Sequence, residues 1–178
     1  MDELVVKWPA RTFAFYAQVR ANSDAILNKT ILAIDPSSGG SSQPGYAIFK
    51  AGELVDSGEL CIPAKKAIHE RLHIMQDMMQ NLLPAAADVL AIEDVSYEKF
   101  SHVYLKWAVG ATIAATKTKV YLLVPLNCWK AISKAMPAYQ KTNATDAILI
   151  GQTLVLLARK FQEEKNAKVQ KSRRKTNR

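Results

Sequence analysis

Three acidic residues stand out because each lies at one end of an apolar segment. Asp35 ends the run "TILAID" and Glu93 ends the closely similar run "DVLAIE". Asp146 lies near the start of a predicted helix, "NATDAILIGQTLVLLARKF", and aligns with Ile150 and Leu157 on its apolar stripe. A carboxylate that faces inward is costly without a partner, so the three acids predict a shared group that balances their charge.

The chemistry of such a site follows from where sheets place their strand ends. If the two apolar runs are neighbouring strands, Asp35 and Glu93 meet at the carboxyl edge of the sheet, where α/β proteins bind ligands. Adjacent carboxylates repel each other unless a cation or a shared proton lies between them. Oxygen-only ligands suit Mg²⁺, with Mn²⁺ as an alternative, and two such ions can activate water and stabilise the leaving oxygen of a phosphodiester.

Each acid also has a simpler interpretation when it is taken alone. Asp35 precedes Pro36, and Asp is a common turn residue at such a position. Glu93 also fits an exposed loop, and Asp146 fits a helix N-terminus, which favours acids. The combination of three acids with a basic C-terminal segment favours the metal site.

The elements that must carry these acids alternate in an α/β order. After "TILAID" comes a Gly/Ser/Pro loop, and "YAIFK" and "ELVDSGEL" then have the pattern of an antiparallel hairpin. Apolar residues recur at helical spacing from Ile68 to Leu82, before the strand that ends at Glu93. A helix over residues 101–116, a fifth strand "KVYLLV" and the final helix follow. This order predicts an α/β fold with a mixed five-stranded sheet flanked by helices.

Length predicts one main domain, and the charge distribution predicts a basic C-terminal tail. We expect an N-terminal extension over 1–29, a folded domain over 30–162, and a basic, disordered tail over 163–178. No apolar run reaches the ~20 residues of a membrane span, and no secretory signal is present, so we expect a cytoplasmic protein. Cys61 and Cys128 lie outside any metal-binding or disulfide pattern and are predicted to be reduced core residues.

Most of the net positive charge lies at the C-terminus. Residues 159–178 hold nine of the 24 Lys and Arg but only two of the 16 Asp and Glu, which leaves 15 basic and 14 acidic residues elsewhere. Such an arm, which includes Arg173 and Arg174, attracts polyanions by counterion release and predicts a nucleic-acid partner. The alternative is a solubilising tail without a partner.

Three segments together resemble the RuvC-type Holliday junction resolvases. They are "ILAIDPSSGGSSQPGYAIF", then "VLAIEDVSYEKF" with the helix "VYLKWAVGATIAAT" after it, and "NATDAILIG". The resemblance covers residues 30 to 158 in the family's order. It implies a ribonuclease H-like fold, a homodimer, and Mg²⁺-dependent nicking of a four-way DNA junction, with Asp35, Glu93 and Asp146 as the acids.

The chain also departs from the family pattern. Asn143 stands where the family usually has a further Asp, so the resemblance implies an auxiliary metal ligand without charge. The segment before "NATD" is short, as in compact virus-encoded members, and leaves Lys130, Lys134 and Lys141 as candidate phosphate contacts, although surface lysines also fit a role in solubility alone. An aromatic side chain that wedges into the junction is implied at Tyr97 or Phe100, although either also fits simple packing on the sheet.

Other classes of protein remain open from the sequence. A non-catalytic nucleic-acid-binding module of the same fold is the main alternative, and Asn143 is its chief argument. The segment "HERLH" matches the HExxH zinc-protease pattern, but His69 and His73 fall opposite the apolar stripe of their helix, so we expect them to face solvent. The "DPSSGG" loop is also found in nucleotide-binding folds, but those need two domains, and no nucleotide cofactor is expected.

Overall fold

Two apolar strands, β1 (Thr30–Asp35) and β4 (Val89–Glu93), lie side by side at the centre of a five-stranded sheet. The computed structural model describes residues 6–10, 12–37, 42–82, 87–95, 103–115, 118, 120–136 and 139–176. The remaining strands are β2 (Gly45–Lys50), β3 (Glu53–Glu59) and β5 (Val120–Val124). The helices are α1 (Phe13–Ala21), α2 (Ser23–Asn28), α3 (Ile68–Leu82), α4 (Val103–Ala115), α5 (Leu126–Ser133) and α6 (Asn143–Thr176).

The sheet is mixed, as the sequence predicts. Its strand order is β3-β2-β1-β4-β5. β1, β2 and β3 form an antiparallel meander, whereas β4 runs parallel to both β1 and β5. Parallel strands are typically buried on both faces, which explains why β1 and β4 are almost continuously apolar. The α/β class and the mixed five-stranded sheet flanked by helices are therefore confirmed.

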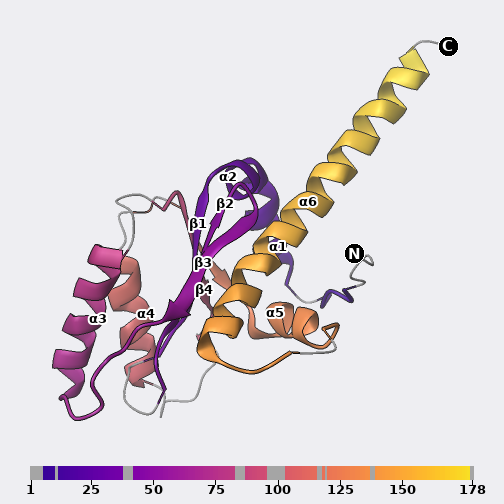
Figure 1. The fold of residues 1–178 in the computed structure, drawn as a ribbon. Helices are drawn as coiled ribbons and strands as arrows, with labels where there is room; N and C mark the ends of the chain where they lie inside the picture. The colour runs from indigo at the N-terminus through magenta and orange to yellow at the C-terminus, as the bar shows by residue number, and fades with distance from the viewer. Residues whose placement is uncertain are drawn as a thin grey trace.

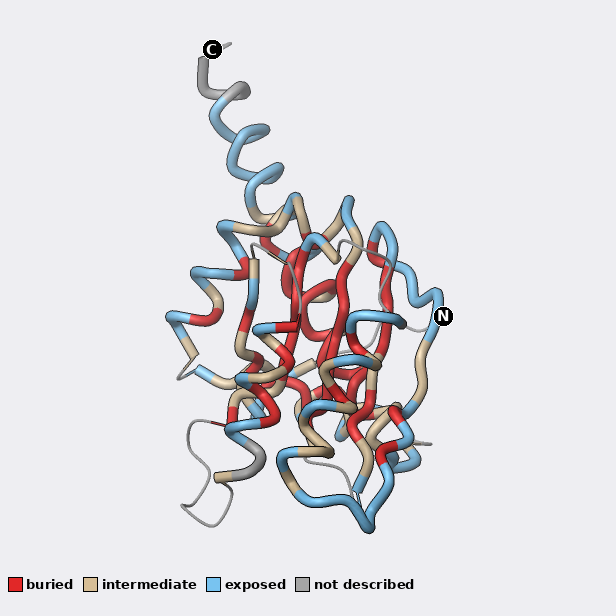
Figure 2. The backbone as a smooth tube through the Cα atoms, turned by 90° about the vertical axis from the view of Figure 1, so that its left-hand side faces the viewer, coloured by how far each residue is buried: buried red, intermediate tan, exposed pale blue. Residues whose placement is uncertain are grey.

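Helices cover both faces of the sheet, so the molecule has three layers (Figure 1). α3 and α4 pack on one face, and α1, α2, α5 and α6 pack on the other. The central strands are buried along their length (Figure 2). Because successive side chains of a strand point to opposite faces, Ile31 and Ala33 join the core under α6, while Leu32 and Ile34 join the core under α3 and α4.

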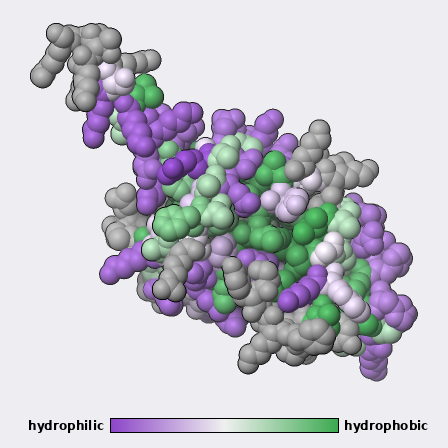
Figure 3. Space-filling view, turned by 180° about the vertical axis from the view of Figure 1, so that it is seen from behind, coloured by the Kyte–Doolittle hydropathy of each residue, from purple (hydrophilic) through white to green (hydrophobic). Residues whose placement is uncertain are grey.

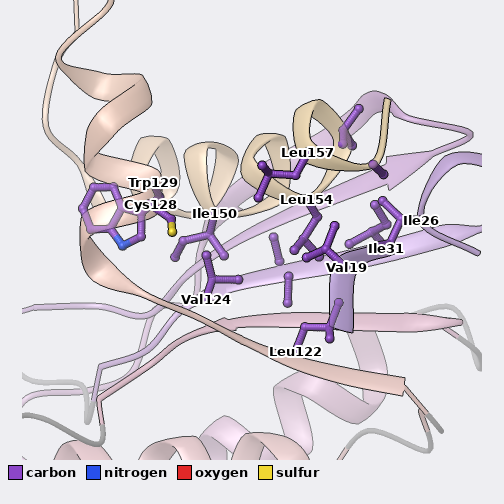
Figure 4. Close-up of a cluster of buried hydrophobic side chains, with 14 of the residues drawn as sticks. Val19, Ile26, Ile31, Leu122, Val124, Cys128, Trp129, Ile150, Leu154 and Leu157 are labelled. Carbon is purple, nitrogen blue, oxygen red and sulfur yellow. The ribbon is translucent and has the colours of Figure 1, made fainter. Parts of the chain in front are cut away.

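The core between the sheet and α6 is formed by large apolar side chains from both layers. Figure 4 shows Ile31 and Val124 of the strands close to Ile150 and Leu154 of α6. α1 contributes to this core as well, because its Val19 is completely buried. The described part of the predicted N-terminal extension is therefore packed against the rest of the domain, through a face that sequence periodicity did not reveal.

The C-terminal segment differs from the disordered tail that was expected. α6 continues without a break to Thr176 and projects well beyond the sheet (Figure 1). Its side chains are exposed from Lys165 to Ser172. Lys, Arg, Gln and Glu are good helix formers, and extending an existing helix avoids the cost of nucleation, so a polar segment can stay helical here without a core of its own.

Two smaller expectations can be compared with the structure. Cys128 is buried, as predicted, whereas Cys61 is exposed after the end of β3, so its assignment to the core is wrong. The helices within the described residues include none with both the length and the apolar character of a membrane span.

Candidate active site

Asp35 and Glu93 end two neighbouring parallel strands on the same side of the sheet. The register pairs Ile34 with Ile92, so the two acids occupy the next position of each strand. Ala33 and Ala91, two residues earlier, both belong to the core under α6. The alternation of strand side chains therefore directs both carboxyl groups toward the helix layer of α5 and α6.

The two carboxyl groups lie close enough for each to shift the pKa of the other. Burial raises the pKa of Asp35 to about 8, and the negative charges of Glu93 and Asp146 contribute to the rise. Burial also raises the pKa of Glu93, although its interaction with Asp35 opposes that rise. Because two neighbouring carboxyl groups in a largely buried site cannot both ionise without cost, the metal-free pair favours retention of a proton.

The start of α6 brings Asp146 to this pair. Gly45 is the antiparallel partner of Asp35, and a Cβ at Gly45 would collide with the backbone carbonyl of Asn143. Only glycine permits this close approach between β2 and the first residue of α6. Asp146 lies one turn further along the helix and is 4% exposed.

The first turn of α6 is fixed by reciprocal hydrogen bonds. The Thr142 hydroxyl accepts from the Thr145 backbone N–H at 3.0 Å, and the Thr145 hydroxyl accepts from the Thr142 backbone N–H at 2.8 Å. This arrangement satisfies two N–H groups that a helix start leaves unpaired, in the manner of a capping box. It therefore fixes the position of Asp146 relative to the sheet.

Asp146 combines burial with a specific partner. Burial raises its pKa to about 6, and the positive charge of Lys130 opposes the rise. Its Oδ1 accepts a short hydrogen bond from the Tyr139 hydroxyl. Sequence reasoning missed Tyr139, since a tyrosine in a loop before a helix carries no signal of such a contact.

Trp129 of α5 was also missed, and it contacts Glu93 directly. Its indole Nε1 donates a hydrogen bond to Glu93 Oε1 at 3.3 Å, while the side chain is 3% exposed. The bond favours the ionised form of Glu93 and thereby opposes the effect of burial on its pKa. Trp129 is buried among apolar residues of the α6 core (Figure 4), so its ring is held in place from behind.

We predict that Trp129→Phe weakens Mn²⁺ binding by about tenfold or more, the typical effect of losing a group that orients a metal ligand. The substitution keeps an aromatic ring but removes the N–H donor to Glu93. Mn²⁺ titration followed by electron paramagnetic resonance measures the affinity without any cleavage reaction. Trp107→Phe is the matched control, because Trp107 on α4 is 52% exposed. Equal affinities in the two variants would rule out this positioning role.

Two of the three candidate lysines act on the acids. Lys130 lowers the pKa of both Glu93 and Asp146 by its charge, and Lys141 lowers that of Asp35. Lys134 follows one helical turn after Lys130, directly after the end of α5, and both line the same surface hollow. All three side chains are exposed and therefore accessible to an anion.

Asn143 has structural partners. Its Nδ2 donates to the Ser42 hydroxyl at 2.9 Å and to the backbone oxygen of Gln43, and its backbone N–H donates to Glu59 Oε1 at 3.2 Å. These bonds tie the start of α6 to the loop before β2 and to the end of β3. In the described part of the chain, no bond joins Asn143 to the three acids.

Whether a divalent ion fits this site depends on all three acids. Among the described residues, no three His, Cys, Asp or Glu side chains are arranged so as to hold a metal ion. The Tyr139 hydroxyl engages Asp146, and the pKa values of all three acids are raised, which favours their protonated forms when no metal is bound. The donors fit Mg²⁺ in kind, as two carboxyl groups already lie together and the charge of the third acts on both.

Several candidates stand apart from these acids. Tyr97 and Phe100 lie outside the described residues. Arg173 and Arg174 fall within the bounds of α6, but their side chains are not among those described. In the HExxH segment, His69 and His73 are exposed on α3, and His73 is paired with Asp77 at 3.6 Å. The prediction that these histidines face solvent is confirmed, and they lie on the opposite face of the sheet from α6.

Comparison with solved structures identifies the class of fold. No family model and no curated protein matches the chain. The fold is of the ribonuclease H-like α/β type and is similar to that of RuvC from Thermus thermophilus. A structure of T. thermophilus RuvC in complex with a Holliday junction substrate matches with a TM-score of 0.56 and 16% identity, covering 71% of this chain and 92% of that one.

A second RuvC structure from Thermus thermophilus gives the same result. It matches with a TM-score of 0.53 and 12% identity, over 77% of this chain and 96% of that one. At these identities the similarity shows the fold, and the chain contains nearly the whole of the fold of those proteins.

Proposed function

We propose that this protein is a Mg²⁺-dependent endonuclease that nicks four-way DNA junctions or other branched DNA. The observation that carries the proposal is the pair of acids at adjacent strand ends, the buried Asp35 and the half-buried Glu93, with the buried Asp146 on the helix above them. The similarity of the fold to RuvC bound to a Holliday junction supports the choice of substrate. A buried, mutually repelling set of acids also has no evident value for stability alone.

The roles of the residues follow from their positions. Asp35, Glu93 and Asp146 would hold the metal, and Trp129 orients Glu93. When bound, divalent ions supply an activated water and stabilise charge on the leaving oxygen. Lys130 and Lys141 lie where they attract the phosphate toward the acids, since their charges already act on these carboxyl groups. Asn143 would act mainly by fixing the start of α6 rather than as a ligand.

DNA binding would use the exposed basic part of α6. Lys165, Lys168 and Lys171 are exposed on the projecting half of this helix. An exposed helix with this positive charge neutralises DNA phosphates without contacting the bases, which suits a substrate recognised by its shape. Arg173 and Arg174 extend the same basic segment, and a cytoplasmic location remains an expectation.

We further propose a homodimer, because nicking two opposed strands of a junction requires two active sites. Exposed apolar side chains support an interface between two copies of the chain. Trp107 on α4 is 52% exposed and Tyr121 on the edge strand β5 is 56% exposed. Apolar side chains also gather in a hollow on the face drawn in Figure 3.

The experiment that tests this function compares a synthetic four-way junction with a linear duplex of the same sequence, in Mg²⁺ or in EDTA. We expect Mg²⁺-dependent nicks near the junction centre and little cleavage of the duplex. A supercoiled plasmid with a cruciform tests the dimer, since paired nicks within one encounter give linear product whereas single nicks give open circles. Cleavage that is equal on junction and duplex would overturn the proposed substrate.

The second candidate is a DNA-binding module that has lost catalysis. It is favoured by the bonds that engage Asn143 and Tyr139, which leave no ready-made metal site among the described residues. Tight junction binding without cleavage in either Mg²⁺ or Mn²⁺ would support it and would contradict the nuclease.

A further inference from the structure

Residues 6–9 of the N-terminal extension pack against the domain through their own side chains and backbone. Val6 and Trp8 pack against the core under α6, so Lys7 between them is exposed on the outside. The backbone oxygen of Pro9 then accepts hydrogen bonds from the Thr12 hydroxyl at 3.1 Å and from the Tyr16 hydroxyl at 2.7 Å. The packing of Val6 and Trp8 on the core therefore leaves the side chain of Lys7 on the exposed side of this segment.

The helix that follows ties the extension to α5 and α6. The Cys128 thiol of α5 donates to the Thr12 hydroxyl at 3.8 Å. The ring of Tyr16 meets that of Phe161 on α6 edge to face, with 6.4 Å between centroids. The extension is therefore part of the surface that α5 presents, although it lies outside the stretch that resembles the resolvases.

A surface hollow of about 630 Å³ opens between the extension and α5, and we call it the Lys7 groove. Lys7 and Pro9 line it from the extension, and Leu126, Asn127, Lys130 and Lys134 line it from α5. Its lining thus includes three lysines and no Asp or Glu. Such a concentration of one charge is repulsive unless an anion is bound.

The position of the groove favours DNA as that anion. Lys130 belongs to the groove, and its charge also acts on Glu93 and Asp146, so the groove borders the acid site. A DNA strand with one phosphate at the three acids would continue along the Lys7 groove. Lysines contact phosphates as point charges and read no bases, which suits a backbone contact.

We propose that the N-terminal extension supplies Lys7 to a groove that binds the DNA backbone beside the scissile phosphate. This inference rests on the proposed function and adds a binding surface to it.

The test measures binding of a labelled four-way junction in EDTA, at salt concentrations from about 50 to about 200 mM. Each lost phosphate contact lowers the slope of log affinity against log salt by about 1. We expect this loss in Lys7→Ala and in Lys134→Ala, with recovery in Lys7→Arg. Lys29→Ala is the control, because this exposed lysine precedes β1 at the end opposite Asp35, about 20 Å away along the strand.

The outcomes distinguish failure of the proposed Lys7 groove from failure of the proposed nuclease function. If the wild type binds the junction with a steep salt slope and the Lys7 and Lys134 variants keep that slope, the groove is wrong and the proposed function stands. If the wild type binds no junction at any salt concentration, both are wrong. Melting temperatures of all variants show whether a loss of binding comes from unfolding, and the Lys134→Ala result decides the case if Lys7→Ala is unstable.

Discussion

Asp35→Asn should abolish junction cleavage and at the same time raise the melting temperature of the metal-free protein. The carboxyl group of Asp35 is 8% exposed, and burial together with the charges of Glu93 and Asp146 raises its pKa to about 8. An amide has nearly the same shape and carries no charge, so it removes the repulsion at high pH. It also removes a metal ligand, for which we expect a loss of at least about 10²- to 10³-fold in cleavage rate.

Opposite effects on stability and activity distinguish a functional acid from a structural one. A residue that only held the fold would lower both when replaced. Cleavage rates in Mg²⁺ and melting curves in EDTA, both at pH 8.5, measure the two effects, and junction binding should be largely unchanged because no phosphate contact is lost. Asp77→Asn is the matched control, since Asp77 is exposed on α3 on the other face of the sheet. Cleavage by Asp35→Asn at the rate of the wild type would refute the role of Asp35.

The central strands and their acids were predictable because the signals are local. An apolar run with a terminal carboxylate, repeated once, indicates two parallel strands and their common edge, and the register of Ile34 with Ile92 agrees. The inward direction of Asp146 followed from helix periodicity in the same way. No such signal exists for Trp129 and Tyr139, whose contacts with Glu93 and Asp146 depend on the packing of α5 and of the loop before α6.

The two ends of the chain were interpreted less well, for physical reasons. Composition showed that residues 163–178 have no core, but it did not show that they would continue an existing helix, which needs no core. The role of the extension depends on Val6 and Trp8 reaching a core formed by residues far along the chain. Asn143 illustrates the same limit, because its type suggests a ligand while its bonds to Ser42 and Gln43 arise from the fold.

Mg²⁺ should bind more tightly as the pH rises from about 6 to about 8, with release of protons from the site. The metal requires ionised carboxylates, whereas burial raises the pKa of Asp146 to about 6 and that of Asp35 to about 8. The effect of pH on the free energy of unfolding has the opposite sign. A raised pKa of Asp35 gives stability that is complete below its usual value of 3.8 and is lost as the pH rises through about 8.

Two measurements on the whole chain test the predicted pH dependence of stability and of Mg²⁺ binding. Melting temperatures in EDTA should fall between pH 6 and pH 8.5, and Mg²⁺ should reverse the fall, because a cation would balance the charge that Asp35 and Glu93 carry once both are ionised. Calorimetric titration in two buffers with different ionisation enthalpies counts the protons released on binding. Asp35→Asn should release fewer protons than the wild type. A Mg²⁺ affinity that is independent of pH would mean that the ion does not bind at these acids, since a site formed by protonated carboxyl groups has to exchange its protons for the metal.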